Sequence, residues 1–385
     1  MPAPEVDGWL RSRRTTFLEG LPLRPVDSPF LPGSSLSISR GQAEVFYLAE
    51  PSGTRWILKK FHRGRSLDRA YLEAVARLLP GDPAFECGSR RRVVDGLDAA
   101  AGYAPPALAA WIGGTVLMPR VKGLDWAALA DRIRDGACAP DPAQRARLCR
   151  ALADAVGALE AAGVSHRDLS SGNVLVEPDR WDVSLIDWDS VFHASLRRPA
   201  NTTLGTNGYM SPVIPRSAEA TDTTWAPHAD RFALAVLCAE FLAMDRGSPL
   251  AADGGLFTNE DFERRTPIVE SIAGVMAERV PGAGDLFVAA VAARDPAGFP
   301  SPGEWTATVS AVAGPPLRPP RLRDMPIDDL AYLGWLDRQQ PQSPMWAAPG
   351  LAELPSGEVV LPPTPLPAGP APAPAPSLPR DPFAP

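Results

Sequence analysis

Residues 163–191 read GVSHRDLSSGNVLVEPDRWDVSLIDWDSV and set three polar side chains around two short apolar runs. Asp168 precedes Asn173 by five residues and Asp187 by nineteen. The apolar runs that follow Asn173 and precede Asp187 each predict a short strand. A pair of such strands would present Asp168, Asn173 and Asp187 at one rim.

That combination of side chains suits phosphoryl transfer. A carboxylate can orient the hydroxyl group that accepts the phosphate. Carboxylate and amide oxygens are ligands that Mg²⁺ takes when it bridges nucleotide phosphates. Two acids and one amide at the rim of a strand pair therefore indicate a magnesium-dependent phosphotransferase.

The same stretch resembles the protein kinase superfamily. HRDLSSGN at 166–173 is similar to the catalytic loop H-R-D-x-x-x-x-N, and Asp187-Trp188-Asp189 stands in the place of D-F-G. The resemblance implies that Asp168 is the catalytic base and that Asn173 and Asp187 hold Mg²⁺. Within the superfamily, the sequence looks most like bacterial Ser/Thr kinase-like proteins with D-x-D-S in place of D-F-G.

Arg167, next to the base, corresponds to a position that receives a phosphorylated residue in kinases regulated through their activation segment. The resemblance therefore counts Arg167 among the catalytic-loop residues. Thr202 and Thr203 are the preferred phosphate acceptors, because Thr206 is expected to contact Asp168 instead.

The nucleotide-binding residues implied by the resemblance lie upstream. Trp56-Ile57-Leu58-Lys59 is similar to V-A-I-K, so Lys59 would reach the α and β phosphates of ATP. Lys60 would point to the other face of the strand. The ion-pair partner expected for Lys59 is Glu86, with Glu73 as the rival.

VLMPRVKG at 116–123 resembles the strand and hinge beside the adenine. Met118 would be the gatekeeper, and Val121 would supply a backbone N–H to the base. The loop that covers the phosphates departs from the family, because only Gly41 remains of its glycines. Side chains in that loop would restrict the approach of backbone amides to the phosphates.

Later segments follow the same order. GTNGYMSP at 205–212 is similar to the end of an activation segment. ADRFALAVL at 229–237 is similar to the start of the central helix, where Asp230 would anchor the backbone of the catalytic loop. Trp188 is expected to pack as core. Asp189 could bind magnesium, pair with Lys59 or cap a turn.

The patterning predicts an α+β, two-lobed, protein-kinase-like fold. Runs 43–49 and 55–61 predict a β-hairpin, 114–121 predicts a strand, and helical patterns cover 68–79 and 83–102 and most of 124–313. The predicted division is an N-terminal extension (1–33), a small lobe (34–121), a large lobe (122–313), a C-terminal extension (314–340) and a proline-rich tail (341–385).

The composition excludes several classes of protein. The 385 residues are 45% hydrophobic and 22% charged, which allows a sizeable core. A net charge of −7 argues against a nucleic-acid partner. The four cysteines form no CxxC pair, which favours reduced thiols over disulfides or a zinc site. With no signal peptide and no membrane-length apolar run, we expect a cytoplasmic protein without a membrane partner.

Proline is concentrated at the end of the chain. Residues 341–385 hold 15 of the 45 prolines, which predicts an extended, disordered tail. The tail could be a spacer or a docking segment, for which the PxxP element from Pro362 to Pro365 is weak support.

The favoured function is an ATP- and Mg²⁺-dependent bacterial Ser/Thr protein kinase whose substrate is a protein, possibly itself. The resemblance also suggests a protein phosphatase as a partner, beside a partner of the tail. A catalytically inactive kinase-like binding module is an alternative, supported by the loss of loop glycines and by Ser170 and Val213 at positions where the family has lysine and glutamate. A small-molecule kinase on the same fold is a third possibility.

Overall fold

The computed structural model describes residues 4–12, 14–28, 35–40, 43–62, 68–98, 105–177, 180–199, 205–213, 225–249, 251 and 255–314. These residues lie within the compact unit Met1–Gln339. Gly41, Thr202, Thr203 and the proline-rich tail lie outside the described residues.

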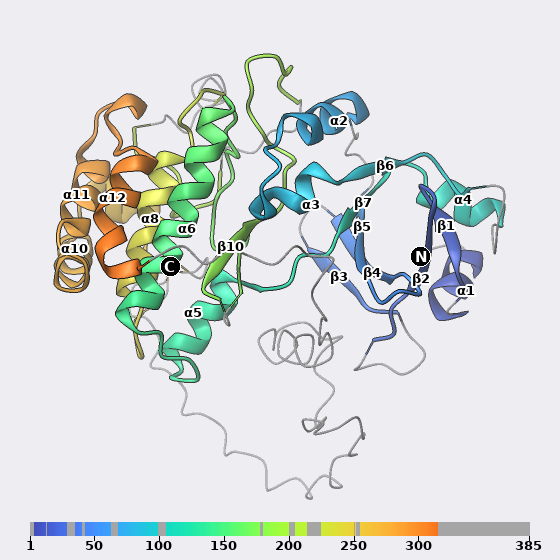
Figure 1. Ribbon diagram of the computed structural model, residues 1–385, viewed down its shortest axis with the longest axis horizontal. Helices are drawn as coiled ribbons and strands as arrows, with labels where there is room; N and C mark the ends of the chain where they lie inside the picture. The colour runs from blue at the N-terminus through green and yellow to red at the C-terminus, as the bar shows by residue number, and fades with distance from the viewer. Residues whose placement is uncertain are drawn as a thin grey trace, which may run out of the picture. The chain divides into compact units, whose positions relative to one another are not determined.

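The first part of the chain builds a mainly antiparallel sheet, drawn in blue to cyan in Figure 1. Among the described residues it has seven strands, in the order β1-β2-β4-β5-β7-β6, with β3 paired to β4. The strands are β1 (Thr16–Leu18), β2 (Leu21–Pro25), β3 (Ser37–Arg40), β4 (Ala43–Ala49), β5 (Arg55–Phe61), β6 (Arg92–Val94) and β7 (Thr115–Pro119).

The expected hairpin is confirmed as β4 and β5, which pair antiparallel around the turn at Pro51–Gly53. Side chains alternate along β5. Trp56 and Leu58 are buried in a core that includes Trp9, whereas Ile57 and Lys59 line a cavity on the other face. Lys60 returns to the first face and donates to the carbonyl of Trp111, as its position next to Lys59 predicts.

The helical pattern read over 83–102 is wrong. That segment forms a 3-10 turn (Pro83–Phe85), the single-turn helix α3 (Glu86–Ser89) and then β6. Two sets of contacts favour this structure over a longer helix. Gly88 packs directly against Leu79 and the Trp188 ring, and the β-branched Val93 and Val94 pair with β7.

Residues assigned to an N-terminal extension belong to the sheet. Helix α1 (Pro4–Ser12) buries Val6 and Trp9, and β2 pairs with the end of β4. The small-lobe sheet therefore begins before residue 34. Two further helices accompany it, α2 (Arg69–Leu78) and α4 (Pro106–Ile112).

The second part of the chain is mostly helical. Helix α8 is apolar almost throughout because it is buried on all sides. Helix α12 packs along α6, and α10 and α11 pack on α8 (Figure 1). The helices are α5 (Trp126–Arg134), α6 (Pro142–Ala161), α8 (Arg231–Ala243), α9 (Asn259–Arg264), α10 (Pro267–Arg279), α11 (Ala283–Ala292) and α12 (Pro302–Ala313).

A small antiparallel sheet, β10-β9-β8, accompanies these helices. Strand β8 (Leu124–Asp125) pairs with β9 (Val174–Glu177), which pairs with β10 (Asp182–Leu185). The two apolar runs of the HRD segment thus form a strand pair, as predicted. Asn173 directly precedes β9, and Asp187 follows the end of β10 by two residues.

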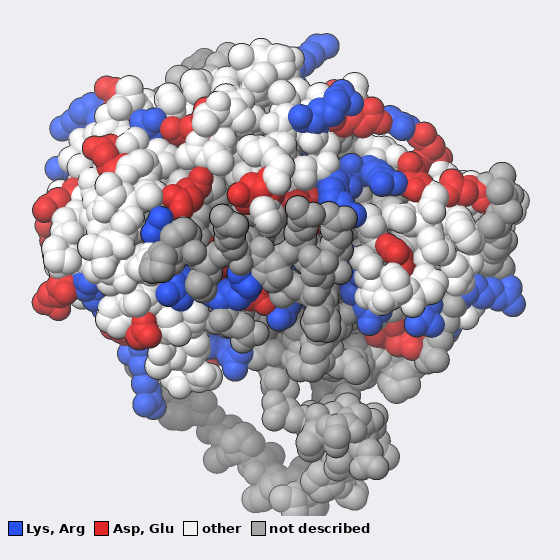
Figure 2. Space-filling view, in the orientation of Figure 1, with Lys and Arg blue, Asp and Glu red and all other residues white. Residues whose placement is uncertain are grey.

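The α+β fold with a β-rich first part and a helical second part is confirmed. In the part of the chain that the structure describes, no helix is long and apolar enough to cross a membrane. On the face drawn in Figure 2, Lys and Arg side chains alternate with Asp and Glu side chains. The absence of a nucleic-acid partner stays a prediction.

Candidate active site

A cavity of about 380 Å³ lies between the small sheet-rich part and the β8–β10 sheet. Its wall is mainly apolar and includes the charged residues Lys59, Arg91, Arg120, Asp125, Asp187 and Asp189. Most of the residues singled out from the sequence contribute to it. They are Lys59, Met118, Val121, Asn173, Asp187, Trp188 and Asp189.

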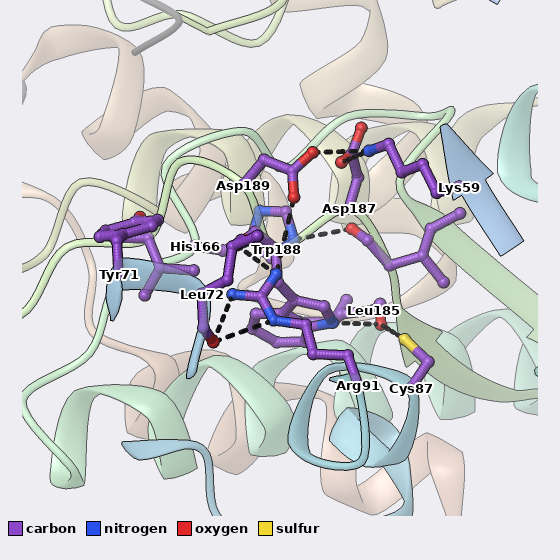
Figure 3. A network of polar contacts seen from close by, with 12 residues as sticks. Lys59, Tyr71, Leu72, Cys87, Arg91, His166, Leu185, Asp187, Trp188 and Asp189 are labelled. Carbon is purple, nitrogen blue, oxygen red and sulfur yellow. Dashed lines mark hydrogen bonds and ion pairs between the residues drawn. The ribbon is translucent and has the colours of Figure 1, made fainter. Parts of the chain in front are cut away.

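Lys59 forms ion pairs across this cavity, as Figure 3 shows. Its Nζ lies 2.6 Å from Asp187 Oδ1 and 2.6 Å from Asp189 Oδ2. Burial disfavours the charge on Lys59, but the two carboxylates outweigh it and raise the pKa of the ammonium group. Burial also acts on Asp187, yet Lys59 holds the pKa of that carboxyl below its usual range.

The partner expected for Lys59 is therefore different from the prediction. Glu86 pairs with Arg90 one helical turn away, and its rival Glu73 pairs with Arg69. The reason is the short α3, which ends after one turn and carries Glu86 away from the cavity, while Cys87 lines the wall. Among the roles considered for Asp189, the ion pair with Lys59 is the one that the structure contains.

Trp188 packs as core, as predicted. The side chain is 2% exposed, and its ring meets Phe85 and His166 edge to face at 5.7 and 4.7 Å. Its Nε1 donates to the carbonyl of Leu185 at 3.1 Å. This packing fixes the backbone that carries the two flanking aspartates.

Asp168 is half-buried and accepts a hydrogen bond from Thr206 Oγ1 at 3.0 Å. The contact expected between these two residues is confirmed. Burial raises the pKa of the Asp168 carboxyl, although Thr206, Arg167 and Lys59 act in the opposite direction. Asn173 Nδ2 donates to the backbone carbonyl of Asp168 at 2.7 Å and so couples the two residues.

The backbone of the HRD segment at 166–168 is held by Asp230. This carboxylate is 2% exposed and accepts from the amides of His166 at 2.6 Å and Arg167 at 2.7 Å. Arg167 has a φ of +68°, a conformation that a non-glycine residue adopts only when its surroundings impose it. The anchoring role expected for Asp230 is confirmed.

The Arg167 side chain is buried. One of its nitrogens donates to the carbonyl of Ser190 at 3.0 Å, and its guanidinium lies 4.9 Å from the centre of the Trp225 ring. Burial lowers the pKa of this group to about 10, so it stays charged near neutral pH. The expected phosphate acceptors of the activation segment lie outside the described residues, so their contact with Arg167 stays a prediction.

The cavity wall also includes Met118 and Val121, which flank Pro119 and Arg120 in the chain. The Arg120 amide donates to the carbonyl of Arg55 at 3.1 Å, which fixes the chain after β7. Val121 lies just beyond that bond and lines the cavity. Met118 and Val121 both line the cavity, and their roles as gatekeeper and hinge stay predictions.

Magnesium requires hard oxygen ligands, and the residues fit this requirement. Because Asn173 Nδ2 bonds the Asp168 carbonyl, its Oδ1 is the atom left to act as a ligand. The Asp187 side chain is 40% exposed towards the cavity. The described residues contain no cluster of three His, Cys, Asp or Glu side chains that could hold a metal.

Arg91, a buried residue in contact with Asp189, was not predicted from the sequence. The available signals were an arginine run, Arg90-Arg91-Arg92, in front of two valines, and an extra acid after Trp188. Glu240, a fully buried acid on α8, was not predicted either.

Comparison with known proteins gives two matches. Residues 116–266 match the protein kinase domain family, which covers the chain from β7 to the loop before α10. Over 136 residues the chain is 34% identical to a protein of Oryza sativa subsp. japonica named as a candidate cyclin-dependent kinase F-2. That alignment covers 35% of this chain and 39% of the relative's length.

Proposed function

Because this chain belongs to the protein kinase superfamily, we propose that it is an ATP- and Mg²⁺-dependent protein kinase. One observation carries the proposal. Lys59 from the small sheet and Asp187 from the segment after β10 meet at 2.6 Å in one cavity, within the same site as Asp168 and Asn173. The acceptor is proposed to be a Ser or Thr hydroxyl of a protein, in the cytoplasm of a bacterium.

The cavity wall combines apolar residues such as Met118 and Val121 with the charged residues Lys59, Asp187 and Asp189, and a nucleotide has both an apolar base and charged phosphates. The adenine would lie against Met118 and take a hydrogen bond from the Val121 amide. Lys59 would donate to the α and β phosphates. Asp187 and Asn173 would hold Mg²⁺, which when bound neutralises charge on the phosphates.

Asp168 would accept the proton of the substrate hydroxyl. Thr206 donates to its Oδ1, and because each carboxylate oxygen has two lone pairs, the group can accept a further hydrogen bond from the incoming hydroxyl. The raised pKa of this buried carboxyl makes it a better proton acceptor than a solvated aspartate. Asp230 would keep the loop in the conformation that aims Asp168 at the acceptor.

A nucleotide-binding module without transfer activity is the second candidate. It is favoured by the loss of glycines from the phosphate-covering loop and by Ser170, a buried serine where the family has a lysine. Both candidates use the same cavity, so they differ only in whether phosphate is transferred.

The test is the intact mass of the protein after incubation with Mg-ATP and a generic protein substrate, beside the Asp168→Asn variant. Phosphate gained by either protein with the wild type but not with the variant would support the kinase. A rise in melting temperature with Mg-ATP, without any phosphate transfer, would favour the binding module. No response to nucleotide in either measurement would count against both candidates.

The partners proposed for the chain are its protein substrate, possibly the chain itself, a protein phosphatase and a protein that binds the proline-rich tail. Autophosphorylation in the mass measurement would identify the first of these directly. Capture of a phosphatase by the full chain, and its loss when residues 341–385 are removed, would link the tail to that partner.

A further inference from the structure

Asp189 bridges two cations in the candidate site. One of its carboxylate oxygens, Oδ2, lies 2.6 Å from Lys59 Nζ, and the other, Oδ1, lies 3.5 Å from Arg91 Nη1. Figure 3 shows the two cations reaching different oxygens of this carboxylate, Lys59 from the side and Arg91 from below in this view. With Asp187, the four groups carry two positive and two negative charges, so the network is neutral.

Arg91 is held in place by contacts other than its ion pair. The residue is 7% exposed. Nη1 donates to the backbone carbonyl of Trp188 at 2.9 Å, and Nε and Nη2 donate to the carbonyl of Leu72 at 3.3 and 3.2 Å. The planar guanidinium therefore ties α2 to the Asp187–Asp189 segment in a fixed orientation.

The network also accounts for two departures from the expected pattern. Neither Glu86 nor Glu73 points to Lys59, since each pairs with an arginine on its own helix turn. In the place of a helix acid, the wall near Lys59 carries the cation Arg91, which would repel Lys59. The carboxylate of Asp189 contacts both cations and offsets their repulsion.

Asp187 and Asp189 differ in what else they can do. Asp187 shares the cavity with Asn173 and is the proposed metal ligand, so Mg²⁺ would compete with Lys59 for its carboxylate. Asp189 is held by Arg91 on its far side and is more buried, at 27% exposure against 40% for Asp187. Of the two aspartates, only Asp189 also pairs with Arg91, which would hold it beside Lys59 when nucleotide and metal bind.

We propose that Asp189 is the lasting partner of Lys59 and that Arg91 is the positioning residue that holds Asp189 in place. The Arg91–Asp189 pair thus has the role expected of Glu86, which is to hold Lys59 in place. Lys59 has three N–H donors, so it can keep Asp189 and still reach the phosphates. This inference rests on the proposed function, because it assumes that the site binds ATP.

The test uses the full-length protein and two substitutions, Asp189→Asn and Arg91→Met. Binding of ATP is measured by calorimetry with EDTA, where Lys59 is the main charged contact for the phosphates. Each variant is expected to weaken this binding by about tenfold or more, because a buried charge loses its partner. The double variant is expected to weaken it little further than the single variants, since both act through one contact.

Arg92→Met is the matched control, because Arg92 is exposed, is next to Arg91 in the chain and donates to the carbonyl of Glu19. Arg91→Lys is expected to recover part of the affinity, since it restores the charge without the fork of donors. If Arg91→Met does not fold, Arg91→Lys and the near-isosteric Asp189→Asn still decide the question. Melting temperatures of all variants identify losses caused by unfolding.

The outcomes separate the inference from the proposed function. Wild-type protein that binds no ATP with or without Mg²⁺ would refute the proposed function itself. Wild-type binding with unchanged affinity in Asp189→Asn and Arg91→Met would overturn the positioning role alone. Asp189→Asn that loses affinity only with Mg²⁺ would make Asp189 a metal ligand instead. If Glu86→Gln weakened metal-free ATP binding more than Asp189→Asn does, Glu86 would be the partner of Lys59 after all.

Discussion

The hydroxyl of Tyr209 donates to the carboxylate of Glu240, at 3.1 Å from Oε1 and 3.0 Å from Oε2. Tyr209 belongs to the GTNGYMSP segment, and Glu240 lies in the last turn of α8 with no exposed surface. Trp126 Nε1 and the Leu256 amide donate to the same carboxylate at 2.8 and 2.9 Å. One buried acid therefore joins the GTNGYMSP segment to α5, to α8 and to the chain just before α9.

The first prediction concerns the pH dependence of stability. Burial raises the pKa of Glu240 from 4.5 to about 7. Between these values the unfolded chain loses the proton and the folded chain keeps it, so the contribution of Glu240 to stability falls as pH rises from 4.5 to 7 and then levels off. Glu240→Gln cannot ionise. The free energy of unfolding of Glu240→Gln minus that of the wild type is therefore expected to increase between pH 4.5 and 7, by an amount on the order of 3 kcal/mol.

Urea unfolding of both proteins at pH 5, 6, 7 and 8 measures this difference, in which the effects of other titrating groups cancel. A difference that stays constant or shrinks towards pH 8 would mean that Glu240 is ionised in the folded protein at all these values.

The second prediction concerns Thr206. Thr206→Val removes the hydroxyl that holds Asp168 Oδ1 but keeps the size and branching of the side chain. We expect the rate of phosphate transfer to fall by roughly 10- to 150-fold, since a lost neutral-to-charged hydrogen bond costs roughly 1.5–3 kcal/mol, while ATP binding is unchanged. Thr206→Ser keeps the hydroxyl and serves as the control. Equal rates for valine and serine would show that the hydrogen bond does not orient the base.

The third prediction concerns the anchor of the catalytic loop. Asp230→Asn replaces one acceptor oxygen by an NH₂ group that faces two backbone amides. The variant is expected to lose about 2–4 kcal/mol of unfolding free energy, because the φ of +68° at Arg167 loses support and a buried amide loses its acceptor. Urea unfolding measures the loss. Glu270→Gln, a change at an exposed acid in the first turn of α10, is expected to alter stability by less than about 0.5 kcal/mol. Similar losses in the two variants would argue against the anchor.

The fourth prediction concerns Gly88, which lies in the segment where the sequence predicted a longer helix. A Cβ at Gly88 would lie 2.5 Å from Leu79 Cδ1 and 2.6 Å from two atoms of the Trp188 ring. Gly88→Ala is therefore expected to destabilise the protein by roughly 1–3 kcal/mol through overpacking. It should also weaken ATP binding, because a shift of Trp188 would displace Asp187 and Asp189, its neighbours in the chain, which pair with Lys59. Gly81→Ala meets no atom within 4 Å and is the matched control. An unchanged melting temperature for Gly88→Ala would show that the indole can move aside without cost.

The sequence predicted the parts of the site that a short segment determines. Asp168, Asn173 and Asp187 flank apolar runs whose pairing follows from their length and pattern, and the hairpin of β4 and β5 sets the face of Lys59. The partner of Lys59 could not be predicted in this way. The choice between Glu86 and Asp189 depends on where α3 ends, which is decided by contacts of Gly88 with residues 9 and 100 positions away along the chain.

Edge strands were equally hard to predict. Strands β1 and β6 have three residues each and no alternation long enough to detect. Their pairing depends on neighbours distant in the chain. Arg91 escaped notice for the same reason, since its role follows from three carbonyl and carboxylate contacts that come together only in the folded protein.

The pairing of β2 with β4 has a practical consequence. A protein shortened to begin at residue 34 would expose backbone hydrogen-bonding groups of Leu48 and Ala49, along with the apolar surface that Trp9, Leu18 and Leu23 now cover. An open strand edge beside an apolar face invites pairing with other chains. Such a shortened protein is expected to aggregate during expression, so the N-terminal segment acts as a solubility element of the domain.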